Sequence, residues 1–223
     1  MALILSIETS TTNCSVSLSR KGKLLIAKED YDKNYSHAER LHVYIDDVLK
    51  QAQVSVNEID AVAISKGPGS YTGLRIGVSA AKGLCFALNK PLISIPTLES
   101  LAHQVTSNDG VIVSMLDARR LEVYAAIFDS NYEQIRETKA EVLNELSFSS
   151  YLENGKVYFI GNGVEKSKNL IVHQNALFID DKLPSANEMG GIAFNKYKIS
   201  DFEDVAYFEP YYLKDFVALK PKS

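Results

Sequence analysis

The spacing of hydrophobic positions predicts the same series of elements twice along the 223 residues. In the first series, apolar runs predict strands at residues 3–9, 14–19, 24–30, 61–65 and 92–95. Helices are predicted at 36–52, where apolar residues recur every three or four positions, at 71–88, and from residue 97 onward. The predicted order is therefore β-β-β-α-β-α-β-α.

The series starts again near Gly110, after the turn-forming cluster Ser107-Asn-Asp-Gly110. Strands are predicted at 111–117, 122–129, 134–142, 157–160 and 176–179, and helices at 145–152, 165–170 and 186–196. A three-stranded meander followed by alternating helices and strands predicts the mixed sheet of a ribonuclease-H-like fold. We therefore expect an α/β protein with two subdomains, residues 1–108 and 109–223, and a cleft between them.

Local sequence signals predict where several of these helices begin. Capping boxes, in which a hydroxyl and a glutamate satisfy each other's backbone amides, are expected at Ser36–Glu39, Ser55–Glu58 and Ser185–Glu188. Thr97 follows a proline and is expected to cap the helix after it.

Composition and charge narrow the class of protein. Hydrophobic residues make up 46% of the chain and charged residues 23%, which is typical of a globular domain. The net charge is −4, and the sequence contains no lysine-arginine cluster. We therefore expect that any role in RNA processing depends on a partner protein that binds the RNA. Cys14 and Cys85 have apolar neighbours, and no signal-like or membrane-spanning run is evident, which favours a cytoplasmic protein without a membrane.

The most conspicuous motif is Gly67-Pro-Gly-Ser-Tyr-Thr-Gly-Leu-Arg-Ile-Gly77, which follows a predicted strand and opens a predicted helix. It is not a Walker A motif, because Leu74-Arg75 occupies the place of Lys-Ser/Thr. It also departs from GxGxxG at Thr72 and from GxSxG at Pro68. Close approach of another helix to its small residues is favoured over direct ligand binding.

Two predicted hairpin turns present polar residues toward the expected cleft. In the first turn, hydroxyl residues follow Glu8, but the Asp-x-Gly pattern of phosphotransferases is missing. A polar β-turn is therefore an equally good interpretation. The second places two arginines between two acids, where surface ion pairs are the simpler explanation. Candidate cleft residues are Glu8, Thr9, Ser10, Gly67, Gly69, Ser70, Asp117, Arg119, Arg120 and Glu122.

The histidines do not predict a metal site. His37 and His42 are five residues apart, which turns them by roughly 140° from each other on a helix. A metal-binding pair on one helix requires spacing of four. His103 and His173 are isolated from carboxylate clusters. We therefore expect no metal site.

Together these motifs resemble the TsaB (YeaZ) family over nearly the whole chain. The segments that carry the resemblance are Ile4–Thr11, Ser36–Glu39, Gly67–Gly77, Asp117–Tyr124 and Glu209–Leu213. The resemblance implies the fold of actin, Hsp70 and sugar kinases. It also implies a non-catalytic subunit, without a cofactor of its own, that activates the TsaD transferase. That enzyme forms threonylcarbamoyladenosine (t6A) at adenosine 37 of tRNAs that read codons beginning with A. The resemblance further implies that a TsaE-like ATPase completes the complex, and that this chain contacts tRNA only indirectly, through the complex.

The resemblance also suggests a docking face made by the first two long helices. Its expected members are Leu41, Ile45, Val48, Gly73, Ile76, Gly77, Ala80, Ala81 and Leu84. The same face would serve a homodimer when TsaD is absent. We expect a large side chain at Gly77 or Ala81 to weaken TsaD binding without unfolding the chain.

Two other functions remain open at the level of sequence. An active ATP-dependent small-molecule kinase of the same superfamily would bind nucleotide by itself, although the Asp-x-Gly pattern is missing. A zinc peptidase is disfavoured by the spacing of the histidines.

Overall fold

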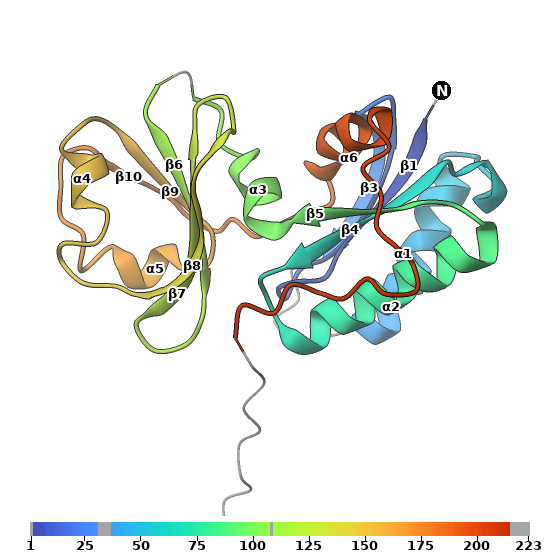
Figure 1. Ribbon diagram of the computed structural model, residues 1–223, viewed down its shortest axis with the longest axis horizontal. Helices are drawn as coiled ribbons and strands as arrows, with labels where there is room; N and C mark the ends of the chain where they lie inside the picture. Colours follow the sequence, from blue (N-terminus) through green and yellow to red (C-terminus); the bar gives the residue numbers. More distant parts are fainter. Residues whose placement is uncertain (1, 31–36, 108, 215–223) are drawn as a thin grey trace, which may run out of the picture.

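The computed structural model describes residues 2–30, 37–107 and 109–214, which form two five-stranded mixed sheets flanked by helices (Figure 1). The strands of the first sheet are β1 (Leu3–Glu8), β2 (Cys14–Arg20), β3 (Lys23–Asp30), β4 (Ala61–Gly67) and β5 (Leu92–Pro96). Their order is β3-β2-β1-β4-β5, with β1 antiparallel to β2 and parallel to β4. β1 and β4 are central and covered on both faces, so nearly all of their side chains are buried, including the polar Ser6, Glu8 and Ser65.

The second sheet repeats the topology of the first. Its strands are β6 (Val111–Asp117), β7 (Glu122–Asp129), β8 (Gln134–Val142), β9 (Val157–Ile160) and β10 (Ala176–Ile179). Their order is β10-β9-β6-β7-β8, which matches the first sheet when read from the opposite edge. The predicted duplication of a ribonuclease-H-like sheet is confirmed.

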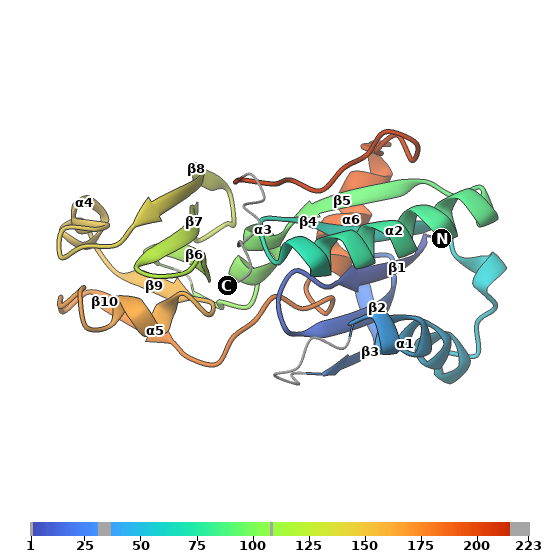
Figure 2. The same cartoon turned by 90° about the horizontal axis from the view of Figure 1, so that it is seen from below.

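Two long helices cover one face of the first sheet. α1 (His37–Gln51) and α2 (Tyr71–Leu88) lie on the same side of this sheet (Figure 2). Their apolar side chains share one core with β1, β2 and β4. The short helix η1 (Val56–Glu58) precedes β4. The corresponding face of the second sheet is covered by two single turns, α4 (Ser149–Leu152) and α5 (Val164–Ser167).

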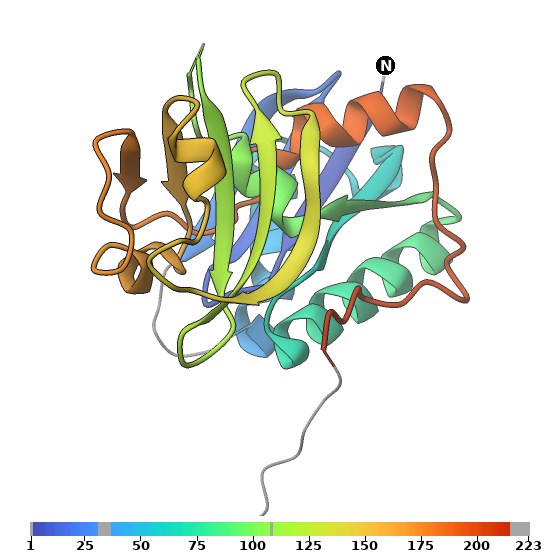
Figure 3. The same ribbon diagram turned by 60° about the vertical axis from the view of Figure 1, so that its left-hand side comes forward.

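The remaining two helices each pack on the sheet of the other half. α3 (Thr97–Ala102) follows β5, yet its Leu98 and Leu101 pack with Ile112 and Phe128 of the second sheet. α6 (Met189–Lys198) follows β10, yet it packs on the first sheet, where Ala61 and Ile93 contribute to the shared core. Figure 3 shows α6 beside the blue strands of the first sheet. A boundary at residue 108 thus separates the strands but not the helices that cover them.

Buried serines on β2 hold the segment that leads into α6. Ser17 Oγ donates to the Ala186 carbonyl at 2.6 Å, and the Ala186 amide donates to Ser15 Oγ at 3.0 Å. A Cβ added at Gly190 would lie 2.8 Å from Ser19 Cβ, so the helix lies directly on the strand. This close approach requires small residues on both sides of the contact.

The capping predictions have mixed outcomes. The capping box is present at Ser55–Glu58, at the start of η1. The one predicted at Ser185–Glu188 is wrong, because α6 begins only at Met189 and its N-cap makes no side-chain bond. The Ser185 hydroxyl instead donates to the Glu29 carboxylate at 2.6 Å. Ser36 lies outside the described residues.

Three other helices also differ from expectation, α3 in its cap and α4 and α5 in their lengths. Pro96 is the N-cap of α3, whereas Thr97 Oγ1 accepts from the Gly67 amide at 3.0 Å. α4 is shorter than predicted because Phe148 adopts a left-handed conformation and the Asn144 amide donates to Ser147 Oγ, which forms a turn in place of helix. α5 is likewise only four residues long. In the described part of the chain, no helix has the length and apolar character needed to cross a membrane.

Candidate functional site

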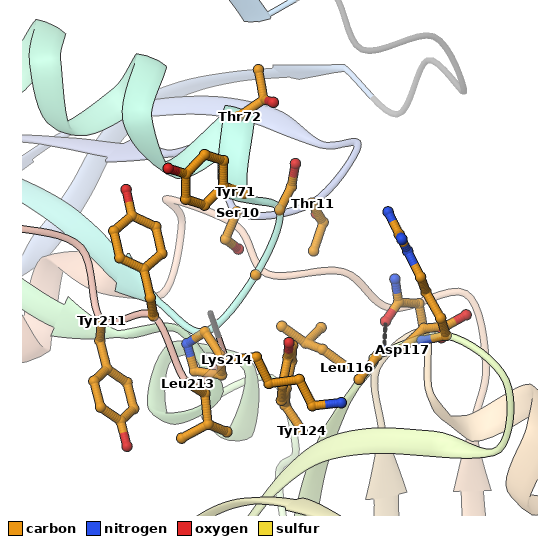
Figure 4. A pocket seen from close by; sticks show the side chains of 17 residues that line it. Ser10, Thr11, Tyr71, Thr72, Leu116, Asp117, Tyr124, Tyr211, Leu213 and Lys214 are labelled. Carbon is orange, nitrogen blue, oxygen red and sulfur yellow. Dashed lines mark hydrogen bonds between the residues drawn. The ribbon is translucent and has the colours of Figure 1, made fainter. Parts of the chain in front are cut away.

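A cleft of about 590 Å³ lies between the two halves (Figure 4). Its walls come from the β1–β2 turn, the start of α2, the β6–β7 turn and the C-terminal segment. The lining residues are Ser10, Thr11, Pro68, Gly69, Ser70, Tyr71, Thr72, Leu116, Asp117, Ala118, Arg119, Tyr124, Asn162, Tyr211, Tyr212, Leu213 and Lys214. A cavity of this size is typical of a small-molecule site.

The glycines of the Gly67–Gly77 segment allow the start of α2 to lie against the β1–β2 turn. A Cβ at Gly69 would lie 2.5 Å from the Ser10 carbonyl oxygen, and one at Gly73 would lie 2.1 Å from the Thr9 carbonyl oxygen. The Ser70 amide donates to the Ser10 carbonyl at 2.6 Å, and Thr9 Oγ1 donates to the Gly73 carbonyl at 2.8 Å. These glycines therefore serve packing within the chain, but what lies against them is the β1–β2 turn and not the helix that the sequence analysis favoured.

Glu8 lies behind the cleft wall and not in it. The side chain is fully buried, and its Oε1 accepts from the Ser10 amide at 2.6 Å. Burial raises the pKa of the Glu8 carboxyl above its ordinary value, although hydrogen bonds from Ser10 oppose this. Its position does not suit an acidic group that would hold a metal next to a phosphate.

The β6–β7 turn is held by a lysine from α5. Lys166 Nζ donates to Asp117 Oδ1 at 2.6 Å, to the Arg120 carbonyl at 2.7 Å and to the Glu122 carbonyl at 2.9 Å. The Asp117 amide donates to Asn162 Oδ1 at 2.8 Å. The turn is therefore a fixed structure anchored to the second half of the protein.

The C-terminal segment forms a wall of the cleft that the sequence analysis missed. The Tyr211 amide donates to the Lys66 carbonyl at 2.7 Å, and Lys214 pairs with Glu122 of the second half. The Tyr71 and Tyr212 rings lie 4.9 Å apart. The motif Glu209–Leu213 was the one sequence signal for this segment. Hydrophobic periodicity predicts helices and strands, but it does not predict where an irregular segment lies in the fold.

The predicted cleft residues divide into two groups. Five of them line the cavity: Ser10, Gly69, Ser70, Asp117 and Arg119. The other five lie nearby without forming its wall: Glu8, Thr9, Gly67, Arg120 and Glu122. The structure thus brings both predicted turns to one cleft.

A second hollow, a groove of about 630 Å³, lies between α1 and α2. Its lining residues are Ala38, His42, Arg75, Ile76, Ser79, Ala80, Gly83 and Leu84. Three members of the predicted docking face, Ile76, Ala80 and Leu84, belong to this groove. Small side chains make its floor low, which would let a partner helix approach closely.

The other predicted members of the docking face are corrected by the structure. Leu41, Ile45 and Val48 are buried in the chain's own core, because the apolar stripe of α1 packs on the first sheet. Gly73, Gly77 and Ala81 are likewise buried, and a Cβ at Gly77 would lie 2.2 Å from Thr9 Oγ1. A large residue at Gly77 or Ala81 would therefore disturb folding, contrary to our expectation.

Acidic groups meet where the segment before α6 contacts the first sheet. Burial, with the neighbouring carboxylates of Glu29 and Glu8 adding to it, raises the pKa of Glu188 to about 7. Asn13 and Asn187 both donate to Glu29. Within residues 2–30, 37–107 and 109–214, no group of three or more histidine, cysteine or acidic side chains has a metal-binding arrangement.

Comparison with known proteins places this architecture in a family. The model of the family described as TsaD, tRNA N6-adenosine threonylcarbamoyltransferase, matches residues 32–222. The Escherichia coli tRNA threonylcarbamoyladenosine biosynthesis protein TsaB is 30% identical over 97% of this chain and 96% of its own length.

Solved structures agree with the sequence matches. The Pseudomonas aeruginosa YeaZ structure superposes with a TM-score of 0.82 at 26% identity, over 96% of this chain and all of that one. The ethanolamine utilization protein EutJ from Carboxydothermus hydrogenoformans shares the fold, with a TM-score of 0.53 at 11% identity over 87% and 90% of the two chains. The chain thus shares the fold of these structures, and it belongs to the TsaB (YeaZ) family.

Proposed function

We propose that this protein is a non-catalytic subunit that binds and activates a TsaD-like transferase during formation of t6A at adenosine 37 of tRNA. The observation that carries the proposal is the groove between α1 and α2, whose floor contains Ala80 and Gly83. The match to the TsaD family model supports it, because a partner with the same fold would present equivalent helices. Helices that meet over small residues can pack closely and exclude water.

The proposal extends to the remaining parts of the complex. A TsaE-like ATPase joins the pair, and tRNA is reached through the assembly, in keeping with the net charge of −4. The same groove would support a homodimer in the absence of the transferase, and the site of action would be the cytoplasm. The kinase alternative is not favoured, because Glu8 is buried behind the cleft.

The groove can be tested with one substitution and a matched control. Gly83 is exposed in the groove, and a Cβ there would meet nothing within 4 Å, so Gly83→Trp would place its side chain in the groove. We expect its affinity for the transferase subunit, measured by isothermal titration, to fall by about tenfold or more. Ala87→Trp, on an exposed position of α2 outside the groove, should bind normally. Equal affinities of Gly83→Trp and wild type would disprove this docking site.

Activation is tested by omission. The transferase, the ATPase, ATP, threonylcarbamoyl-adenylate and unmodified tRNA are combined with or without this chain, and modified adenosine is quantified by mass spectrometry. Product should form only when the chain is present and should be lost again with Gly83→Trp. Equal product without the chain would remove the proposed role.

A further inference from the structure

The tip of the β6–β7 hairpin, residues 117–122, presents two arginines whose charges are not matched by its own acids. The sequence suggests pairs between these arginines and the flanking Asp117 and Glu122. In the structure, Asp117 pairs with Lys166 and Glu122 pairs with Lys214. Within the described part of the chain, neither arginine side chain has a hydrogen bond or an ion pair, and both are exposed.

The backbone of the tip is strained to hold this arrangement. Arg119 and Arg120 have φ values of 74° and 50°, in the left-handed region that most residues avoid. Lys166 fixes the tip by donating to one side chain and two carbonyl oxygens within it. Glycine or asparagine would suit the backbone better, so arginine at both positions contributes nothing to folding that the structure explains. Strain of this kind is typical of functional sites.

We infer that the Arg119–Arg120 tip docks on a partner protein that presents clustered carboxylates. Two adjacent guanidinium groups suit carboxylates, each of which can accept a pair of parallel hydrogen bonds. Nucleic acid fits less well, because the chain has a net charge of −4 and its sequence contains no lysine-arginine cluster of the kind that grips a phosphate backbone. The tip belongs to the second half, whereas the groove lies between α1 and α2 of the first, so the two surfaces can be occupied at the same time.

The inference rests on the proposed complex for its natural partners, and the double variant Arg119→Gly/Arg120→Gly tests it. Removing the strain should raise Tm by roughly 2–4 °C, while removing the charges should weaken binding. The transferase subunit and the ATPase are titrated separately at 50 and 500 mM NaCl. We expect the affinity for one of them to fall about tenfold at low salt, with a smaller difference at high salt.

Lys21→Gly is the matched control. Lys21 is also basic and exposed, its backbone also has a left-handed conformation, and it lies at the tip of another hairpin. It should gain stability without losing affinity. Unchanged binding of both proteins to the double variant would overturn the inference. So would a loss of affinity for unmodified tRNA with protein binding intact, since that would make the occupant RNA.

The outcome remains decisive if the proposed complex is wrong. If the wild-type protein binds neither the transferase subunit nor the ATPase, the Gly83→Trp comparison gives no information. The tip is then tested directly by adding hexaglutamate and following the arginine side-chain signals by NMR. Saturable shifts confined to Arg119 and Arg120, and suppressed by 500 mM NaCl, support the inference. No shift, or shifts spread over all arginines, would overturn it.

Discussion

The surroundings of Glu188 oppose its charge. It lies beside Glu29 and Glu8, and only Lys182 among its charged neighbours favours the ionised form. The folded protein therefore keeps the Glu188 proton up to about pH 7, whereas the unfolded chain releases it near pH 4.5. The free energy of unfolding must fall as pH rises through this window, because the folded state binds the proton more tightly.

Replacing Glu188 with glutamine should remove this penalty. We expect Glu188→Gln to raise the free energy of unfolding at pH 8 by on the order of 1–2 kcal/mol, since the side chain is partly exposed and its charge is screened. Little change is expected at pH 4.5. Thermal unfolding between pH 4.5 and 8 measures this, with Glu153→Gln on the surface as control. A gain of equal size at both pH values would contradict the electrostatic explanation.

Contacts between individual residues were the feature that the sequence predicted least completely. Ser10, Asp117 and Arg119 were correctly brought to one cleft, because the duplicated pattern places both hairpin turns at equivalent positions. The pairing of Asp117 with Lys166 was not foreseen, since 49 residues separate the two. Tyr211 was missed for the same reason. Contacts of this kind depend on tertiary arrangement, which residue spacing does not encode.

At the scale of elements, α2 has two faces with opposite roles. One face lies on the first sheet, where Gly73 and Gly77 leave room for the β1–β2 turn. The other lines the groove through Ile76, Ala80 and Gly83. The bounds of the helix itself were predicted to the residue. Which face is left open by the chain's own packing could not be read from the sequence, since small residues occur on both.

A pair of alanine substitutions on α2 distinguishes its faces. Gly73→Ala should lower the free energy of unfolding by about 1–3 kcal/mol, because its Cβ would overlap the Thr9 carbonyl oxygen. Gly83→Ala should raise it by about 0.5–1 kcal/mol, because the site is open and alanine favours helix. Urea unfolding of both variants measures the difference. Destabilisation of similar size at both positions would contradict the assignment of faces.

At the scale of the whole molecule, each sheet depends on a helix from the other half. α3 covers the second sheet, and α6 covers the first. The sequence correctly predicted two repeated sheets, but it assigned every helix to its neighbouring strands. Short connections usually justify that assumption, and here the connections from β5 to α3 and from β10 to α6 cross between the halves.

This exchange predicts that the first half cannot fold by itself. A fragment of residues 1–108 lacks α6 and exposes the apolar face around Ala61 and Ile93. We expect it to aggregate or to bind the dye ANS strongly, whereas co-expression with residues 109–223 should give a soluble complex. A monomeric fragment with a sharp thermal transition would show that the first sheet does not need its covering helix.

The crossing of α6 also sets the order of events on the ribosome. β5 ends at Pro96 and α6 begins at Met189, so more than ninety residues are translated before the first sheet receives its cover. At cellular elongation rates this delay is roughly 5–20 seconds. A nascent chain that stops early therefore displays an apolar surface that the finished protein hides. A product truncated between β5 and α6 thus carries its own signal for chaperones and proteases.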